Sequence, residues 1–259
     1  IGGCPEGVAT AAAVKALETA LTKGSPALRS AAAEGCILAG EQLQAGGSAE
    51  QAVRLFDVVR AAELPKQRII EATRGAILAR GSAGIPLLME QLRSADNDLF
   101  GIGLRAAREL AGGKVTEALA AELPQVSPER QVQLLMVLAD RGDTAALPVV
   151  LQAAKSDSEE VRRMAVRALG YLGNASCVPM LLEMALSEDA SLAPVALSVL
   201  ADVSGEGVDD DIVARLADAG GKMRLVLIEL AGQRVIRAAV PLLLSAADDP
   251  DIQVRAAAL

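Results

Sequence analysis

A period of about 31 residues runs through most of this chain, and it constrains the fold more than any other feature of the sequence. Leu99, Arg130, Val161, Leu192, Met223 and Val254 follow one another at this constant spacing. Further back, Ile69 lies 30 residues before Leu99, and Leu28 lies 41 residues before Ile69. All of these residues except Arg130 are apolar. A fixed period of this length is typical of repeat proteins, in which each unit packs only against its neighbours.

A second set of positions supports the same period. Pro148 and Pro179 are one period apart. Pro86 lies two periods before Pro148, and Pro241 lies two periods after Pro179. Proline is tolerated in the first turn of a helix, where its missing N–H would have no intrahelical partner. These prolines therefore predict the start of a second helix in each unit.

Apolar spacing predicts the first helix of each unit. Val161, Ala165, Leu169 and Leu172 follow the i, i+4, i+8, i+11 pattern of one helical face. The polar residues Asp157, Ser158, Ser127, Asp248 and Asp251 precede the predicted first helices, and Gly81, Gly142 and Gly173 follow them. Aromatic residues make up only 1% of the chain, so its apolar content is Ala, Leu and Val, which favours helices over sheets.

The sequence therefore predicts an all-α fold, a right-handed α-α superhelix of about seven stacked helical hairpins. Paired helices of this length cannot bury their apolar faces alone, and stacking closes a continuous core. We expect one array over residues 1–259. Its predicted parts are a partial unit at 6–24, units at about 25–63, 64–95, 96–126, 127–156, 157–188, 189–219 and 220–248, and a partial unit at 249–259.

Two segments carry a family resemblance. Residues 156–170 read SDSEEVRRMAVRALG and are followed by VPMLL at 178–182, while residues 249–255 read DPDIQVR. These segments resemble HEAT repeats of the short bacterial type, similar to the HEAT-like repeats of phycobilin lyases. The resemblance covers nearly the whole chain, but it weakens at Arg130, at residues 28–69 and at 209–211, where the Val-Pro pair should stand. It implies an armadillo-like scaffold that binds other proteins.

The ends and the cysteines give further expectations. Both ends fall inside repeat units, so we expect a fragment of a longer array or of a multidomain protein. Cys4, Cys36 and Cys177 do not form a disulfide framework, and unpaired cysteines fit the cytoplasm better than an oxidising compartment. Residues 1–4 resemble the end of a lipoprotein signal, but the apolar stretch that must precede them is missing. No apolar run is long enough for membrane insertion.

Composition excludes several kinds of chemistry. The chain has no His and no Trp, which removes His-based catalytic triads and the His-Glu iron sites of HEAT-like deoxyhypusine hydroxylases. The net charge is −8, and residues 156–259 carry 16 acidic and nine basic side chains. An acidic surface without Lys/Arg clusters repels nucleic acid and anionic lipid, so neither is an expected partner. A basic protein patch remains a candidate partner, although an acidic surface also serves solubility alone.

Two charged groups have a functional and a structural interpretation. Arg29, Arg162, Arg224 and Arg255 occupy one repeat position, and such a row binds carboxylates or phosphates. In HEAT-like repeats this arginine instead reaches an acidic residue near the turn between units, and Asp157 and Asp251 stand near enough for that role. Residues 209–211 (DDD) offer oxygen ligands for Ca²⁺, but acidic residues at a helix N-terminus are favoured by the helix dipole. We favour the structural interpretation for both.

The remaining candidate site is a surface on the second helices, which line the concave side of HEAT arrays. The predicted partner-binding residues are Leu87, Glu90, Gln91, Val149, Gln152, Met180, Glu183, Met184, Leu242 and Ser245. Met adapts its shape to a partner and carboxylates select basic residues, although the apolar members also suit a core between units. We expect a non-catalytic scaffold or protein-recognition module that binds a protein or an adjacent domain, with no cofactor, metal or small-molecule substrate. The alternative is an accessory subunit or domain of a modifying enzyme, similar to a lyase.

Overall fold

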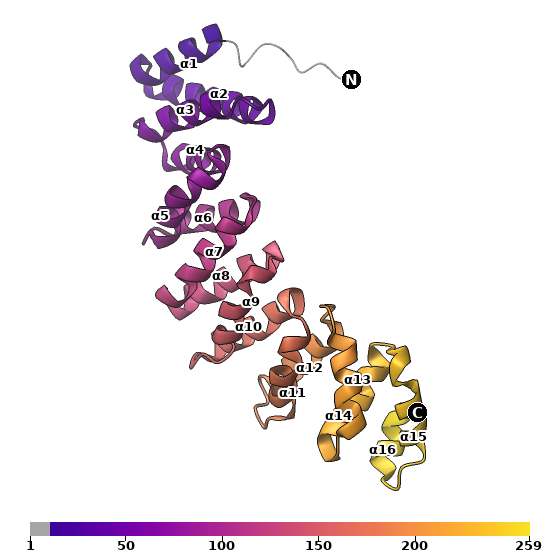
Figure 1. Cartoon of the computed structure of the whole chain (residues 1–259). Helices are drawn as coiled ribbons and strands as arrows, with labels where there is room; N and C mark the ends of the chain where they lie inside the picture. The colour runs from indigo at the N-terminus through magenta and orange to yellow at the C-terminus, as the bar shows by residue number, and fades with distance from the viewer. Residues whose placement is uncertain (1–10) are drawn as a thin grey trace. The chain divides into compact units, whose positions relative to one another are not determined.

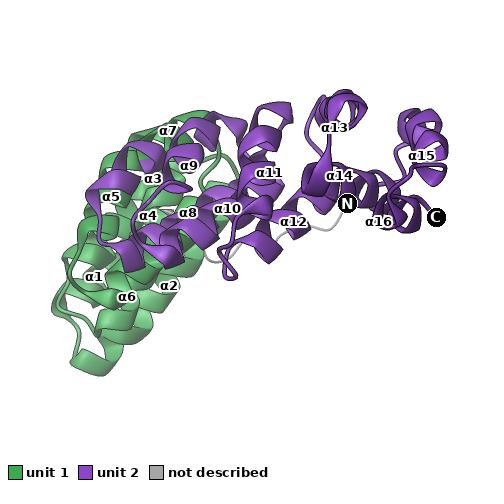
Figure 2. Ribbon diagram, turned by 90° about the horizontal axis from the view of Figure 1, so that it is seen from below, with its two compact units in different colours: residues 1–118 green, residues 119–259 purple. Residues whose placement is uncertain are grey.

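The computed structural model describes residues 11–259, which form sixteen α-helices and five short 3-10 helices, with no strand in that range. The predicted all-α fold class is confirmed. The first five residues of the predicted partial unit at 6–24, Cys4 and the rest of the segment 1–4 lie outside the described residues. The chain divides into two compact units, residues 1–118 and residues 119–259 (Figure 2).

Two layers of helices form unit 1. Its helices are α1 (Ala11–Lys23), α2 (Pro26–Ala45), α3 (Ala49–Ala61), α4 (Lys66–Ala79), α5 (Ile85–Arg93) and α6 (Asn97–Glu109), with the 3-10 helix η1 (Gly81–Gly84) before α5 (Figure 1). Helices α2, α4 and α6 lie side by side, and α1 and α3 contact each other on the second layer. Helix α7 (Gly113–Glu122) contains the boundary between the two units.

Unit 2 repeats the same two-layer stacking. Its helices are α8 (Pro128–Arg141), α9 (Leu147–Ala153), α10 (Glu159–Leu172), α11 (Val178–Leu186), α12 (Ala193–Asp202), α13 (Val208–Asp218), α14 (Gly221–Gln233), α15 (Val240–Ala247) and α16 (Ile252–Ala258). The 3-10 helices are η2 (Leu123–Gln125), η3 (Thr144–Ala146), η4 (Ala175–Cys177) and η5 (Arg237–Ala239). Helices α8, α10, α12, α14 and α16 contact one another in succession, and α9, α11, α13 and α15 pair with them. Each unit therefore stacks its helices as an α-solenoid does.

The helix boundaries follow from local chemistry. Pro86, Pro148, Pro179 and Pro241 lie in the first turn of α5, α9, α11 and α15, as predicted. Each of these four helices directly follows a 3-10 turn, which delivers the chain into the helix. Ser158 caps α10, because its hydroxyl accepts a hydrogen bond from the backbone N–H of Val161. The period and the number of repeats stay predictions.

The predicted core face of the first helix is confirmed in α10. Val161, Ala165, Leu169 and Leu172 are all buried. In the following pair, the first helix begins later than the period predicts. Leu192 caps α12 instead of lying inside it, because Pro194 stands in the first turn and sets the start of the helix.

The turn after α14 carries backbone strain. Val235 has a φ of 54°, in the left-handed region, and it is the one residue other than glycine with a positive φ between residues 11 and 259. The N–H of Ile236 donates to the carbonyl of Ala231 and closes the helix end. At the end of α8 the same position is occupied by Gly142, which adopts a φ of 62° without a steric penalty. A β-branched residue incurs that penalty in full.

We expect Val235→Gly to stabilise the protein. Relief of the left-handed strain outweighs the extra chain entropy of glycine, and the lost side chain is 76% exposed, so the net gain is about 0.5–1 kcal/mol. Urea unfolding followed by far-UV circular dichroism measures it. Val235→Ala is the matched control, because it shortens the side chain but keeps a Cβ atom in the strained conformation. Equal stability of the Gly and Ala variants would contradict this account.

Candidate partner-binding surfaces

The predicted partner-binding residues lie on second helices of both units. Leu87, Glu90 and Gln91 are on α5 in unit 1, whereas the residues on α9, α11 and α15 belong to unit 2. The structure thus brings the α5 group together and presents the other groups on a separate unit.

On α5, one of the three predicted residues is buried. Glu90 is exposed and Leu87 is half-buried against the core, but Gln91 is only 4% exposed, and its side-chain amide donates to the carbonyl of Leu87. The reason is Gly103 on α6, where a Cβ atom would lie 3.2 Å from the Cβ of Gln91. Because Gly103 has no side chain, α6 packs closely over Gln91. Gln91 is therefore a packing residue in this structure.

The accessible part of α5 borders a shallow groove. Glu90 lines it with Pro86, Arg93, Ser94 and the small exposed part of Gln91, and the groove has a volume of about 450 Å³. Leu99 of the first turn of α6 also lines it. Glu90 thus lies at the edge of a hollow with an apolar wall.

On α11, the predicted residues form a ridge of mixed character. Met180 and Met184 are half-buried, and Glu183 between them is exposed. Leu181 and Leu182 point into the core and are buried. Helix α11 therefore holds the ridge rigidly, because its opposite face is fully packed.

Helices α9 and α15 present smaller versions of this ridge. Val149 is half-buried and Gln152 exposed on α9, and Leu242 is half-buried and Ser245 exposed on α15. Neither helix contributes a charge at these positions. The charged part of the surface in unit 2 therefore depends on α11 and on the helix that follows it in the same layer, α13, which contacts α11.

Helix α13 adds residues that the sequence analysis did not select. Asp211, Ala214 and Arg215 line a groove of about 450 Å³ together with Asp218 and Met223. Positions 211, 214 and 215 lie one period after those of the α11 ridge, so the period itself was the signal. It was missed because α13 lacks the Val-Pro pair that marks the other second helices.

Charges in the α13 groove are partly compensated. Arg215 donates from Nε to one carboxylate oxygen of Asp211 at 2.5 Å and from Nη2 to the other at 3.2 Å. Asp218, in the last turn of the same helix, is exposed and forms no ion pair with another described residue. The groove therefore keeps an uncompensated carboxylate.

The acidic run at 209–211 is a helix start, as the structural interpretation predicted. All three residues lie in the first turn of α13, where exposed N–H groups favour negative charge. Asp209 is paired with Arg234, and Asp211 with Arg215. Among residues 11–259, no group of three or more Cys, Asp or Glu side chains is arranged to hold a metal ion.

The arginine row is engaged within the protein. Nη1 of Arg162 donates to the carbonyls of Ser156 and Asp157 at 2.8 and 3.0 Å, and Arg255 makes the same pair of bonds to Asp249 and Pro250. The expectation that Asp157 and Asp251 provide carboxylates for these arginines was wrong, because the turn carbonyls lie closer to the guanidinium. Arg224 does pair with a carboxylate near a turn, that of Asp249 at 2.7 Å.

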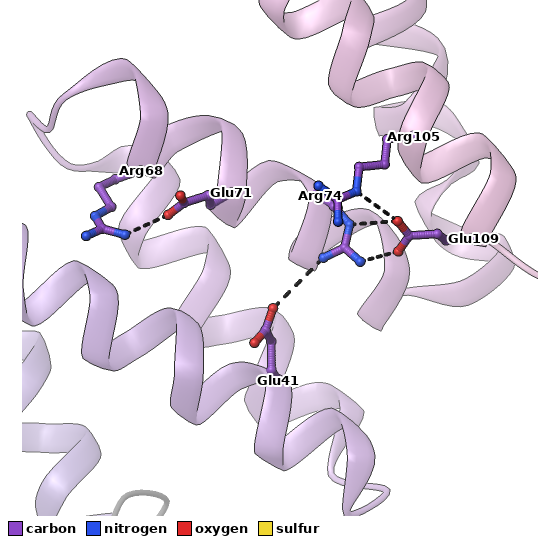
Figure 3. A network of polar contacts seen from close by, with 6 residues as sticks. All are labelled: Glu41, Arg68, Glu71, Arg74, Arg105 and Glu109. Atoms are coloured by element: carbon purple, nitrogen blue, oxygen red, sulfur yellow. Dashed lines mark hydrogen bonds and ion pairs between the residues drawn. The ribbon is translucent and has the colours of Figure 1, made fainter.

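In unit 1, charged side chains on the first helices pair with one another across the stack. Figure 3 shows Arg74 of α4 between Glu41 of α2 and Glu109 of α6, with Arg105 also bonded to Glu109. Burial alone would raise the pKa of Glu109, but the hydrogen bonds from Arg74 and Arg105 outweigh it and lower that pKa below its usual value. This layer of unit 1 uses its charges internally.

Net charge is distributed unequally between the units. Of the 33 acidic and 25 basic side chains, 13 of each fall in residues 1–118, which leaves 20 acidic and 12 basic in residues 119–259. Unit 1 is therefore neutral overall, and unit 2 carries the whole net charge of −8. No helix within residues 11–259 has the length and apolar character needed to cross a membrane.

Three solved structures are similar to this chain over most of its length. Kap95p, from a structure that describes its binding to RanGDP, is 14% identical, with a TM-score of 0.46, over 95% of this chain and 38% of that one. Human deoxyhypusine hydroxylase is 16% identical, with a TM-score of 0.42, over 83% and 96%. One chain from the structure of the CpcE–CpcF complex of phycocyanin lyase from Nostoc sp. PCC7120 is 17% identical, with a TM-score of 0.41, over 99% of this chain and 96% of that one.

The family comparison finds a match for part of the chain. No curated protein matches the sequence significantly. The model of the family described as HEAT repeats matches residues 116–201, which include the segment whose resemblance was noted from the sequence. The segment 116–201 is therefore similar to HEAT repeats.

Proposed function

We propose that this protein is a non-catalytic recognition module whose unit 2 binds a basic, partly apolar protein segment on its second helices. The observation that carries the proposal is the ridge on α11, where the exposed carboxylate of Glu183 stands between the half-buried Met180 and Met184. Stacked repeats create extended surfaces of this kind for binding other proteins. The thioether side chains adapt to an apolar surface, and the carboxylate selects a cation.

The neighbouring helix supports the same kind of partner. The groove on α13 contributes Asp218, whose carboxylate has no ion pair among the described residues, and the unit has a net charge of −8. A negative surface potential speeds the association of a positively charged segment. Gln152 on α9 and Ser245 on α15 add exposed groups on other second helices of unit 2 that offer hydrogen bonds without charge.

Selection from a library of short random peptides displayed on phage tests this proposal. We expect the immobilised protein to enrich peptides that combine Lys or Arg with an apolar residue. For the enriched peptides, Glu183→Lys should raise the Kd roughly tenfold, because it replaces an attraction by a repulsion. Added salt should weaken the binding as well.

Glu229→Lys is the matched control. Glu229 lies on α14 in the first-helix layer, is exposed and forms no ion pair with another described residue, so the substitution changes the net charge of unit 2 equally. We expect it to leave the Kd within about twofold of the unsubstituted protein. No enrichment, or an equal response to both variants, would count against the proposal.

A further inference from the structure

A groove in unit 1, apart from the predicted ridge, has the opposite charge character. It lies between α1 and α3, with a volume of about 540 Å³, within the range of ligand-binding pockets. Its apolar lining comes from Val14 on α1, Leu43 on α2 and Leu55 on α3. Leu55 is 1% exposed, so the base of the groove is part of the packed core and has a fixed shape.

Two cations stand at the rim of this groove. Lys15 lies on α1 and Arg54 on α3, so they face the groove from its two walls, and both side chains are exposed. Neither forms a hydrogen bond or an ion pair through its side chain with another residue in the described part of the chain. This contrasts with the first-helix layer of the same unit, where Arg68, Arg74 and Arg80 are all paired with carboxylates.

One carboxylate also borders the groove. Glu18 lies one turn after Lys15 on α1, and no ion pair joins it to Arg54 among the described residues. Burial raises the pKa of the Cys36 thiol, and the negative charge of Glu18 raises it further, to about 11. The rim therefore has an excess of one positive charge, with the two cations on opposite walls.

We infer that this groove binds an acidic protein segment that inserts an apolar side chain between α1 and α3. The apolar base takes up the side chain, and carboxylates that flank it in the segment pair with Lys15 and Arg54. Guanidinium and ammonium groups without internal partners lose no existing ion pair when they bind a carboxylate, so their attraction contributes fully to recognition. Glu18 accepts a hydrogen bond from a backbone or side-chain donor of the segment.

The partner chemistry separates this site from the one on unit 2. The second helices of unit 2 present carboxylates and thioethers, whereas this groove presents cations around aliphatic side chains. A segment suited to one surface is repelled by the other. The inference does not depend on the proposed function, and each can fail alone.

Phage-displayed random peptides again provide the probe, with selection on the full chain and counter-selection on the Arg54→Glu variant. We expect the surviving peptides to carry Asp or Glu beside a large apolar residue. Measured by fluorescence anisotropy, their Kd should rise roughly tenfold on Arg54→Glu and on Lys15→Glu. Both substitutions are at exposed positions, and circular dichroism verifies that the variants remain folded.

Two controls make the result decisive. Lys23→Glu changes the same charge on the same helix, outside the groove, and should leave the Kd unchanged; Glu183→Lys in unit 2 should also have no effect. Replacing the apolar residue of a selected peptide by Ser should abolish its binding. The inference is overturned if no selected peptide responds to Arg54→Glu, if the responsive peptides are basic, or if the Ser-substituted peptide binds equally well.

Discussion

Replacing Phe56 by Ala should destabilise unit 1 by about 3–5 kcal/mol, the cost of removing a large aromatic side chain from a packed core. Phe56 lies on α3 and is fully buried. Its ring sits between two glycines, since a Cβ atom at Gly40 on α2 would lie 2.7 Å from the ring, and one at Gly75 on α4 would lie closer still. The ring thus fills the space where α2 and α4 lack side chains.

The loss is large because the surrounding helices cannot close the gap easily. Helices α2, α3 and α4 contact one another, so movement of one disturbs both others. Chemical unfolding followed by far-UV circular dichroism measures the change, as the chain contains no Trp for fluorescence. Leu38→Ala on α2 is the control, because Leu38 is 50% exposed and its removal should cost well under about 1 kcal/mol.

The glycines test the same packing from the other side. Ala is normally favoured over Gly inside a helix by about 1 kcal/mol, and Gly101→Ala on α6 should show that gain, because its Cβ meets no atom within 4 Å. Gly75→Ala should instead destabilise by about 1–3 kcal/mol through overpacking against Phe56. Combining Gly75→Ala with Phe56→Leu should recover part of the loss. If Gly75→Ala behaves like Gly101→Ala, Phe56 does not fill this space.

The sequence was most informative about elements that depend on local chemistry. The four repeat prolines marked helix starts correctly, since proline acts on its own backbone and needs no distant partner. The apolar face of α10 was also predicted correctly, because helical periodicity fixes which residues share a face. Both signals operate within one helix.

Contacts between two helices could not be predicted from proline positions or from helical periodicity. Gln91 was placed on the surface by its position in the helix, but it is buried because Gly103, on the next helix, allows α6 to approach. Arg74 and Glu109 pair between separate helices, which no helical spacing anticipates. The arginines at 162 and 255 reach turn carbonyls, and backbone acceptors cannot be distinguished by residue type.

The candidate surfaces also combine features that one helix determines with features that need several helices. The period predicts equivalent positions on the second helices, and the same spacing leads to Asp211, Ala214 and Arg215 on α13, where the Val-Pro pair is missing. The groove between α1 and α3 was not predicted, because its lining comes from three helices. The sequence also does not indicate that Lys15 and Arg54 lack partners among the described residues.

Arg234→Ala should destabilise unit 2 by about 2–4 kcal/mol. Arg234 ends α14, and its side chain is only 9% exposed. Nη1 donates to the carbonyls of Leu200 and Ala201 at 2.8 and 3.1 Å, near the end of α12, where carbonyls lack intrahelical partners. Nε and Nη2 donate to Asp209 in the first turn of α13 at 2.8 and 2.6 Å.

One guanidinium therefore joins the ends of α12 and α14 to the start of α13, and its removal leaves two partly buried carbonyls and a carboxylate without their donor. Arg237→Ala is the matched control, because Arg237 is exposed, lies in the next turn and forms no side-chain bond with another described residue. Arg234→Lys should recover only part of the stability, since one ammonium cannot reproduce a planar fork that serves two helix ends and a carboxylate. Urea unfolding gives the free energies, and hydrogen exchange should show faster exchange at the start of α13 in Arg234→Ala. If Arg234→Ala costs no more than Arg237→Ala, the bonds across these three helices do not stabilise the unit, and packing of Leu200 and its apolar neighbours must hold it alone.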